Sequence, residues 1–336
     1  MRAPFALGCL ALVYLSAVFA GFVAPYDPTT QHRELAFVSP TRIHFVDDTG
    51  RLHLRPFVYA MIPASTGTAV IEDRSRPYPI RFVVRGARGR VAGVADSDWH
   101  LFGTESPTPL FLFGSDDFGR DLFSRLLFGG QISLFAGLLG AALSLALGTV
   151  IGGVAGYYGG WVDEINMRIA ELFLALPWLY LLFAVRMALP LDLAPTQAFL
   201  LVLILIAVVG WARPARLVRG LVLSARARDY VAAARCLGAS DAYLLRRHVL
   251  PQIIGMLLTQ AALLAPQYIL AEVTLSFFGL GVEEPVPSWG NMLASLQRYH
   301  VVASYWWMFL PGIVMVPVFW LYHSLADALH RRAMST

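Results

Sequence analysis

The sequence predicts an all-α polytopic membrane protein with six transmembrane helices and a small β-rich extracytoplasmic insert between the first two. Three observations support this fold class. Hydrophobic residues make up 57% of the 336 residues, whereas soluble domains contain roughly 45 to 50%. Charged residues make up only 14%, and the mean hydropathy is +0.60. In water such a chain would expose large apolar surfaces, so we expect a bilayer protein rather than a soluble enzyme.

Six segments are candidate spans, because a membrane helix needs about 20 mostly apolar residues. They are residues 4–23, 132–157, 169–189, 198–211, 253–278 and 305–325. The first segment could also be a cleaved signal peptide, since Val18 and Ala20 suit a small-residue cleavage site. Arg2 alone makes a weak positive region and the apolar run is long enough to span, so we favour an uncleaved helix within residues 1–24.

The placement of arginine predicts the orientation, because cytoplasmic loops retain positive charge. The loop at residues 213–250 holds eight Arg and two Asp, whereas the rest of the chain has more acidic than basic residues. We therefore expect this loop and both termini in the cytoplasm, and residues 25–130 outside. A solvated face or a patch for anionic lipid is the simpler reading of an Arg-rich loop.

Several function classes are excluded by residue usage. The chain has no Lys, so it lacks the P-loop that holds nucleotide phosphates, and a partner must hydrolyse any ATP that drives it. Cys9 and Cys236 show no disulfide or metal-site pattern. No His pair has metal-ligand spacing, and no Ser lies in a nucleophile motif. We expect no catalytic residues, no cofactor, no metal ion and no nucleic-acid partner.

Residues 28–110 differ from the apolar segments, since they are polar and rich in Pro and Gly. Paired alternating runs predict two hairpins: 42–46 with 51–57 around an Asp-Asp-Thr-Gly turn, and 79–84 with 90–94 around Gly86 and Gly89. This small β-rich domain is either a docking surface for an external partner or an insertion without a function of its own.

The cytoplasmic loop holds the most informative pattern. The stretch that begins at Ser224 is rich in Ala, Leu and Arg, which favours a helix, and Gly238 supplies a stop because Gly tolerates the left-handed conformation. Ser240 or Asp241 can cap a second, short helix at residues 241–248. Pro251 should prevent this helix from continuing unchanged into the next span. We expect a short amphipathic helix along the inner face of the membrane.

This stretch resembles the cytoplasmic signature of binding-protein-dependent ABC importer permeases, which reads EAA, three residues, Gly and a later Leu-Pro. On the pattern lie Ala233, Ala234, Gly238, Leu250 and Pro251. Ala232 replaces the signature Glu. The resemblance implies that the short helix sits in a cleft of an ATPase subunit and moves with it. The coupling residues that it implies are Ala233, Ala234, Gly238, Ala239, Ser240, Asp241, Tyr243, Leu244, Arg247, Leu250 and Pro251.

Two further stretches resemble the dipeptide, oligopeptide and nickel branch of these permeases. Residues 113–129 are similar to the segment before its second span, through Asp116, Gly119, Arg120, Asp121, Ser124 and Arg125. Residues 269–293 are similar to its fifth span and outer loop, through Glu272, Ser276, Gly279, Gly281, Pro287, Trp289, Gly290 and Asn291. The resemblance covers residues 113–336 well and implies a permease core of five helices at 131–336.

Small residues and ionisable residues within the spans suggest packing and polar contacts. Small residues recur at every fourth position of the second span: Gly140, Ser144, Gly148, Gly152 and Gly156. This spacing lets helices approach closely, so we predict a packing seam at Gly148, Gly152 and Gly156, within the subunit or towards a second permease. Glu171, Glu272, Arg186 and His323 lie within or near spans, where ionisable groups are costly.

Glu171 and Glu272 are candidates for lining a path or for a polar contact between helices. A position near a span end, within reach of headgroups, is the alternative. For Glu272 we favour a structural contact over contact with cargo.

Together these patterns predict a permease subunit of an ATP-driven importer for peptides, in the cytoplasmic membrane of a bacterium or archaeon. The resemblance implies four kinds of partner: a homologous second permease, two ATP-binding subunits, an extracytoplasmic solute-binding protein and the lipid bilayer. Two other classes remain open: a proton-coupled secondary transporter that uses Glu171 or Glu272, and a membrane-anchored scaffold or sensor that acts through residues 28–110. The cargo is implied by resemblance alone.

Overall fold

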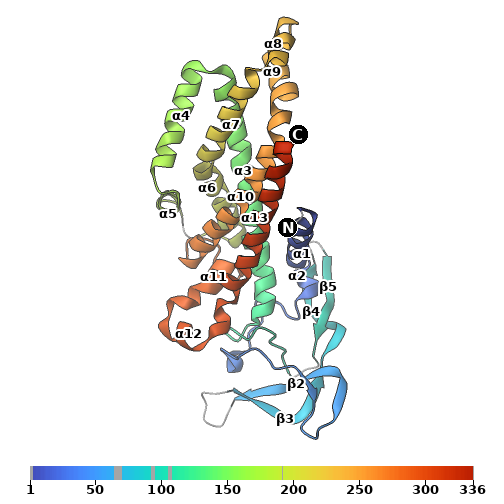
Figure 1. The fold of residues 1–336 in the computed structure, drawn as a ribbon. Coiled ribbons are helices and arrows are strands. Elements are labelled where there is room, and N and C mark those ends of the chain that lie inside the picture. Colours follow the sequence, from blue (N-terminus) through green and yellow to red (C-terminus); the bar gives the residue numbers. More distant parts are fainter. Residues whose placement is uncertain (1–2, 64–69, 92–94, 105–107, 191, 336) are drawn as a thin grey trace. The chain divides into compact units, whose positions relative to one another are not determined.

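The computed structural model describes residues 3–63, 70–91, 95–104, 108–190 and 192–335. The chain is mostly helical, with a smaller β region in its first third (Figure 1). It forms two compact units. The helical unit comprises residues 1–10, 134–275 and 316–336, and the mixed unit comprises residues 11–133 and 276–315.

The helical unit is built from long apolar helices and from two short helices, α8 and α9, which lie between α7 and α10 in the sequence. Its elements are most of α3 (Leu122–Tyr158), α4 (Gly160–Ala175), α5 (Trp178–Met187), α6 (Pro195–Gly210), α7 (Ala212–Arg226), α8 (Asp229–Cys236), α9 (Asp241–Leu244), most of α10 (Leu250–Phe277) and the second part of α13 (Leu310–Ser335). Arg219 on α7 ties α4 in place, since its Nε donates to Asp163 Oδ1 at 3.0 Å.

The mixed unit contains the strands. Its elements are the second half of α1 (Ala3–Val18), α2 (Ala20–Val23), β1 (His44–Val46), β2 (Leu52–Pro63), β3 (Val70–Pro79), β4 (Arg81–Val91), β5 (Ala95–Gly103), α11 (Trp289–Ala294) and α12 (Tyr299–Ser304). One antiparallel sheet has the order β1-β2-β3, and β4 pairs with β5 in a second. β1 and β2 form the first predicted hairpin, closed by Gly50 at φ 81° and by the Asp47 carboxylate, which accepts from Arg51 N at 2.9 Å.

The second predicted hairpin was wrong. β4 continues through Gly86 and Gly89 and pairs with β5, so that Arg90 lies opposite Asp96. Val94, at the end of the predicted second strand, is outside the described residues. Gly86 serves close packing rather than a turn, because a Cβ there would lie 2.7 Å from His100 Cδ2.

Among the described residues, three helices have the length and apolar composition to cross a membrane: α3, α10 and the stretch Trp306–Arg332, which α13 dominates. Two bent pairs, α4 with α5 and α6 with α7, bring the number to five if each pair is one span. α1 is apolar but has only 16 residues. A count of six therefore requires α1 as a further span.

The segment 169–189, predicted as one helix, is broken. α4 and α5 meet at an angle of 90°. Pro177 explains the break, since a proline ring disfavours helical backbone at the residue before it. Leu176 is accordingly extended, at φ −88° and ψ 141°.

Candidate functional site

The segment between α7 and α10, residues 227–249, is the part of the predicted cytoplasmic loop that projects from the helices (Figure 1). α7 itself is packed on its neighbours, with Ala215, Val218 and Val222 buried. The predicted loop at 213–250 therefore divides into a buried helix and a shorter projecting segment, which we call the α8–α9 segment.

Gly238 ends α8 in a well-defined turn. Its φ is +86°, its N donates to Arg235 O at 3.0 Å, and Ala239 N donates to Ala234 O at 3.1 Å. This pair of bonds is the Schellman motif, which requires a left-handed residue at the position of Gly238. A Cβ at Gly238 would meet nothing within 4 Å, so the backbone conformation, and not space, favours glycine here.

The short helix predicted at 241–248 continues into the following helix. α9 begins beside Ser240, whose Oγ accepts from Tyr243 N at 3.4 Å, and a π-helical turn at Leu245–Val249 joins α9 to α10. The helix thus continues without a break, but not unchanged, since its winding widens to a π turn just before Pro251. A proline within a helix loses a backbone hydrogen bond and clashes with the carbonyl four residues earlier, and the wider π turn accommodates this without a break.

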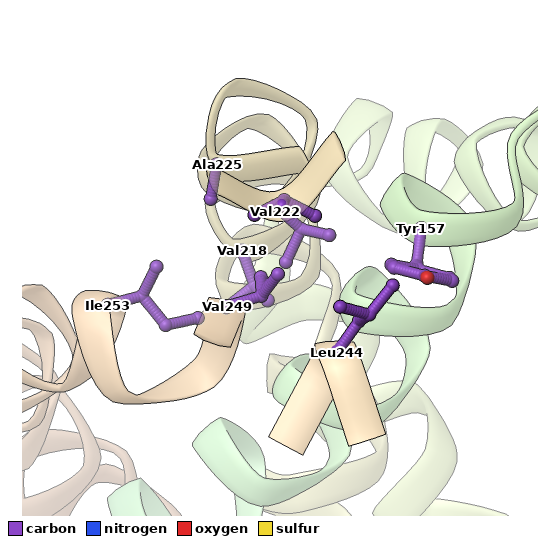
Figure 2. Close-up of a cluster of buried hydrophobic side chains, with 8 residues drawn as sticks. Tyr157, Val218, Val222, Ala225, Leu244, Val249 and Ile253 are labelled. Carbon is purple, nitrogen blue, oxygen red and sulfur yellow. The ribbon is translucent and has the colours of Figure 1, made fainter. Parts of the chain in front are cut away.

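A buried apolar cluster fixes the α8–α9 segment to α3 and α7 (Figure 2). Its members are Tyr157, Val218, Val222, Ala225, Val231, Leu244, Val249 and Ile253. Leu244 and Val249 are fully buried at its centre. Because close-packed side chains transmit displacement, movement of this segment would be passed to both helices.

Tyr157, near the end of α3, adds polar bonds to the same attachment. Its hydroxyl donates to Asp241 Oδ1 at 2.7 Å and accepts from Arg235 Nη2 at 2.8 Å. The Arg226 and Arg235 guanidinium carbons lie 5.7 and 5.6 Å from the ring centroid. The Tyr157 side chain thus contacts Arg235 before the Schellman turn, Asp241 after it, and Arg226 at the end of α7.

The opposite side of the α8–α9 segment is exposed. Leu237 is 89% exposed and Tyr243 52%, next to exposed Arg246 and Arg247. Of the coupling residues inferred from resemblance, those exposed are Ala233, Gly238, Ser240, Asp241, Tyr243, Arg247 and Pro251. Leu244 is buried, and Ala234, Ala239 and Leu250 pack against the cluster. Ala232, at the position of the signature Glu, is also exposed.

The three glycines predicted as a seam lie against α7. A Cβ at Gly148 would be 2.5 Å from Pro214 Cβ, one at Gly156 would be 2.7 Å from Arg219 O, and one at Gly152 would overlap the Ala215 carbonyl. Of the two locations considered for this seam, the contact is within the subunit.

The two candidate carboxylates have different surroundings. Glu272 on α10 is completely buried. Glu171 on α4 is 52% exposed and pairs with Arg168 at 3.3 Å. Arg186 is buried and donates to Pro190 O at 2.9 Å, and His323 bonds to Phe319 O. The structure does not bring Glu171 and Glu272 together.

In the mixed unit, a cluster of ion pairs joins the motif at residues 113–129 to the outer loop of the motif at residues 269–293. Glu284 accepts from Arg120 Nη1 at 2.7 Å and from Arg125 Nη2 at 2.7 Å, and Asp116 accepts from Arg120 Nε at 2.6 Å. The side chains of Arg120 and Arg125 are 6% and 1% exposed. A cavity of about 310 Å³ adjoins the cluster, lined also by Asn291 and Arg298.

Trp289 and Ser288 fasten the outer loop to the start of α3. Trp289 Nε1 donates to Leu126 O at 2.9 Å, and its backbone N donates to Ser133 Oγ at 3.1 Å. Ser288 and Asn291 form a reciprocal capping box at the start of α11. The motif residues at 113–129 and at 276–291 therefore build one polar assembly. No cluster of His, Cys, Asp and Glu suited to a metal ion occurs among the described residues.

Comparison with known families decides the class. Residues 148–335 match the model of the binding-protein-dependent transport system inner membrane component, which is more than half of the chain. The chain belongs to this family. The matched region begins at the glycine seam and includes the α8–α9 segment.

Curated members of this transport family with similar sequences are named as peptide permeases. The dipeptide transport system permease protein DppC of Bacillus subtilis is 36% identical over 65% of this chain and 66% of its own length. The oligopeptide transport system permease protein OppC of the same organism is 38% identical over 62% of this chain and 66% of its own. The chain thus spans just under two thirds of each. One similar solved structure is "Inward facing conformations of the MetNI methionine ABC transporter: CY5 native crystal form". The match has a TM-score of 0.45 and 14% sequence identity, and it covers 63% of this chain and 97% of the chain in that structure.

Two residues of this family member were missed by sequence reasoning. Tyr157 was predicted only as the end of a span, and Glu284 only as part of an outer loop. Tyr157 lies at the expected cytoplasmic end of α3, and its partners Arg226 and Arg235 are 69 and 78 residues away in the sequence, so no local pattern marks it. No local pattern marks Glu284, whose partners are 159 and 164 residues away in the sequence.

Proposed function

We propose that the chain is a permease subunit of an ATP-driven importer with peptides as the cargo class. Residues 1–24 form the first span, residues 25–130 lie outside with the β region at 28–110, and residues 131–336 form the permease core. The six spans are α1 with α2, α3, α4 with α5, α6 with α7, α10, and α13. Both termini then lie in the cytoplasm of a bacterium or archaeon, and the α8–α9 segment lies on the same side. The similarity to named dipeptide and oligopeptide permeases supports the cargo class.

The observation that carries this proposal is the construction of the α8–α9 segment. Its outer side presents Leu237, Tyr243 and Arg247, and its inner side is fixed to α3 and α7 by a buried apolar cluster. This is the arrangement that a lever needs: an exposed surface for a cytoplasmic ATPase, and a packed attachment that passes its displacement to the spans. The partners are two ATPase subunits, a homologous second permease and an extracytoplasmic solute-binding protein.

Gly238→Val tests the proposal, with Gly220→Val as the matched control. A Cβ at either glycine meets nothing within 4 Å, but only Gly238 has a positive φ. Val at Gly238 should distort the Schellman turn and misplace the exposed face. In proteoliposomes that contain the partner subunits, we expect at least a tenfold lower ratio of peptide uptake to ATP hydrolysis, whereas Gly220→Val keeps the ratio.

Normal coupling in the Gly238→Val variant would contradict the lever. A proton-coupled carrier would behave differently in the same vesicles. A proton ionophore would abolish its uptake, and removal of ATP would not.

A further inference from the structure

The β4–β5 hairpin is attached through one face, on which Phe82, opposite Phe102, stays 69% exposed, and its other face is free of such attachments among the described contacts. His100 is buried and its Nδ1 lies 2.6 Å from Ala24 O, which directly follows α2. Phe102 packs on Phe123, with ring centroids 5.7 Å apart. Trp99, Leu101 and Val83 are 41%, 37% and 55% exposed. The exposed face is therefore apolar and aromatic although the hairpin is firmly attached at its other face.

The attachment point fixes the height of the hairpin relative to a bilayer. α1 and α2 together run from Ala3 to Val23, which at 1.5 Å per residue is about 30 Å, the thickness of the hydrocarbon core. If α1 is the first span, α2 lies at the outer boundary of the hydrocarbon. Both strands of the hairpin run beside α2 (Figure 1). The hairpin must then lie at the level of the outer headgroups.

The exposed face of the hairpin carries side chains that suit the lipid headgroup region. Arg85 is opposite Trp99 in the ladder, and its guanidinium carbon lies 5.0 Å from the Trp99 ring centroid. The Arg85 side chain is 72% exposed, and its Nε lies 4.0 Å from Asp98 Oδ2. Tryptophan is enriched where membranes meet water, and a planar guanidinium suits phosphate oxygens.

We propose that this face of the hairpin binds the outer leaflet, with Trp99 and Leu101 at the level of the headgroups and upper acyl chains and Arg85 on lipid phosphate. The contact holds the β region against the bilayer beside the first span. The proposal rests on the six-span topology for the position of α1, and it makes the lipid surface the partner of the β4–β5 hairpin.

Nitroxide labels on single cysteines test the contact in the full chain. Cys9 and Cys236 are first replaced by Ala, and the chain is reconstituted in phospholipid nanodiscs. The labelled variants are Leu101→Cys, Leu54→Cys and Leu12→Cys. Leu54 is 98% exposed on β2, in the other sheet, and Leu12 is 69% exposed on α1. Collision rates with oxygen, which partitions into lipid, are compared with those of a water-soluble nickel chelate.

We expect the Leu101 label to collide with oxygen readily and with the chelate at least fivefold less often than the Leu54 label does. Equal chelate access at both positions would overturn the proposal, and so would shielding of the Leu101 label from both reagents, which indicates a protein cover. The Leu12 label distinguishes failure of the six-span topology from failure of the hairpin contact. If the chelate reaches the Leu12 label, α1 is not a span and the topology is wrong. If the Leu12 label is embedded in lipid but the Leu101 label is not, only the proposed hairpin contact is wrong.

A matched pair of arginine variants tests the phosphate contact. Arg76 lies over Tyr78 on β3, with its guanidinium carbon 5.4 Å from the ring centroid, and so repeats the Arg85 and Trp99 stack on the other sheet. Arg85→Gln should at least double chelate access at the Leu101 label, whereas Arg76→Gln should leave it unchanged. Equal effects of the two variants, or no effect of Arg85→Gln, would contradict a role for Arg85.

Discussion

At the scale of single residues, charge balance within the mixed unit depends on Glu284. Arg120 and Arg125 are almost fully buried, and Asp116 and Glu284 are the acids within 4.0 Å of both. A buried guanidinium without a matching anion is costly, because the protein interior replaces its hydration poorly. Glu284 therefore links the segment before α3 to the outer loop by electrostatic necessity as well as by geometry.

Glu284→Gln should destabilise the chain by about 2–3 kcal/mol, because Asp116 is then the one carboxylate within 4.0 Å of both buried arginines. The expected loss is below that for fully buried pairs, since the Glu284 side chain is 41% exposed and partly screened by solvent. Thermal unfolding of the purified chain in detergent measures it. Glu283→Gln, at the exposed neighbour, is the control, and equal midpoints for both variants would show that the cluster contributes nothing.

Asp121 predicts a pH dependence of stability. Burial raises the pKa of Asp121 from 3.8 to about 7, although hydrogen bonds from Ser124 act in the opposite direction. Between these values the native state keeps a proton that the unfolded state has lost, so the free energy of unfolding falls as pH rises from about 4 to 7. Asp121→Asn should remove this component and raise stability at pH 8 by an amount on the order of 3–4 kcal/mol.

Unfolding midpoints at pH 5 and pH 8 check this expectation. The wild type should lose more stability between the two values than the Asp121→Asn variant does. A variant that is less stable than the wild type at pH 8 would indicate that the native state does not raise the pKa of Asp121.

The site residues that could be predicted lie in short sequence motifs, whereas those that were missed depend on contacts between distant parts of the sequence. Gly238, Asp116, Arg120 and Arg125 lie in short motifs with fixed spacing, so a resemblance could single them out. Glu284 acquires its role only through contacts across more than 150 residues, which no local pattern encodes.

At the scale of elements, α3 and α7 touch backbone to backbone along the glycine seam. Gly152→Ala should cost about 1–3 kcal/mol, because its Cβ would overlap the Ala215 carbonyl and force the helices apart. Gly153→Ala is a close control, since a Cβ at the adjacent position meets nothing within 4 Å. Midpoints of thermal unfolding should fall for the first variant and rise slightly or stay constant for the second. Equal midpoints would refute close packing at Gly152.

Elements were predictable where one pattern acted alone. The cores of α3, α6, α10 and α13 follow from apolar composition, and the first hairpin follows from its turn residues. Prediction failed where tertiary packing overrode a local rule: Gly86 in β4 serves close packing against His100 and not a turn. The break at Pro177 has a purely local cause, because a proline disfavours helical backbone at the residue before it.

At the scale of the whole molecule, the proposed topology predicts which side of the membrane each unit reaches. Cys236 is exposed in α8, and Leu54 is 98% exposed on β2. In a chain with Cys9→Ala, a membrane-impermeant maleimide should label Cys236 in inverted vesicles and not in intact spheroplasts. A Leu54→Cys variant with Cys236→Ala should show the reverse. Labelling of both positions from one side would contradict the six-span arrangement.

The broad class of the molecule could be predicted from composition and motifs, since both act over the whole chain. The number of spans could not be fixed by length alone, because α1 is short and two candidate spans are bent. What the sequence could not supply is the height of the β region relative to the membrane, which depends on how β4 and β5 pack beside α2.

The π turn at Leu245–Val249 has a consequence for engineering. Such a turn contains one more residue than regular winding would need, so deletion of a single residue there would let α9 and α10 join as ordinary helix. Because the extra residue adds no net rotation about the helix axis, the shortened chain would keep the direction of its Arg-rich face and lose only the local widening of the helix before Pro251.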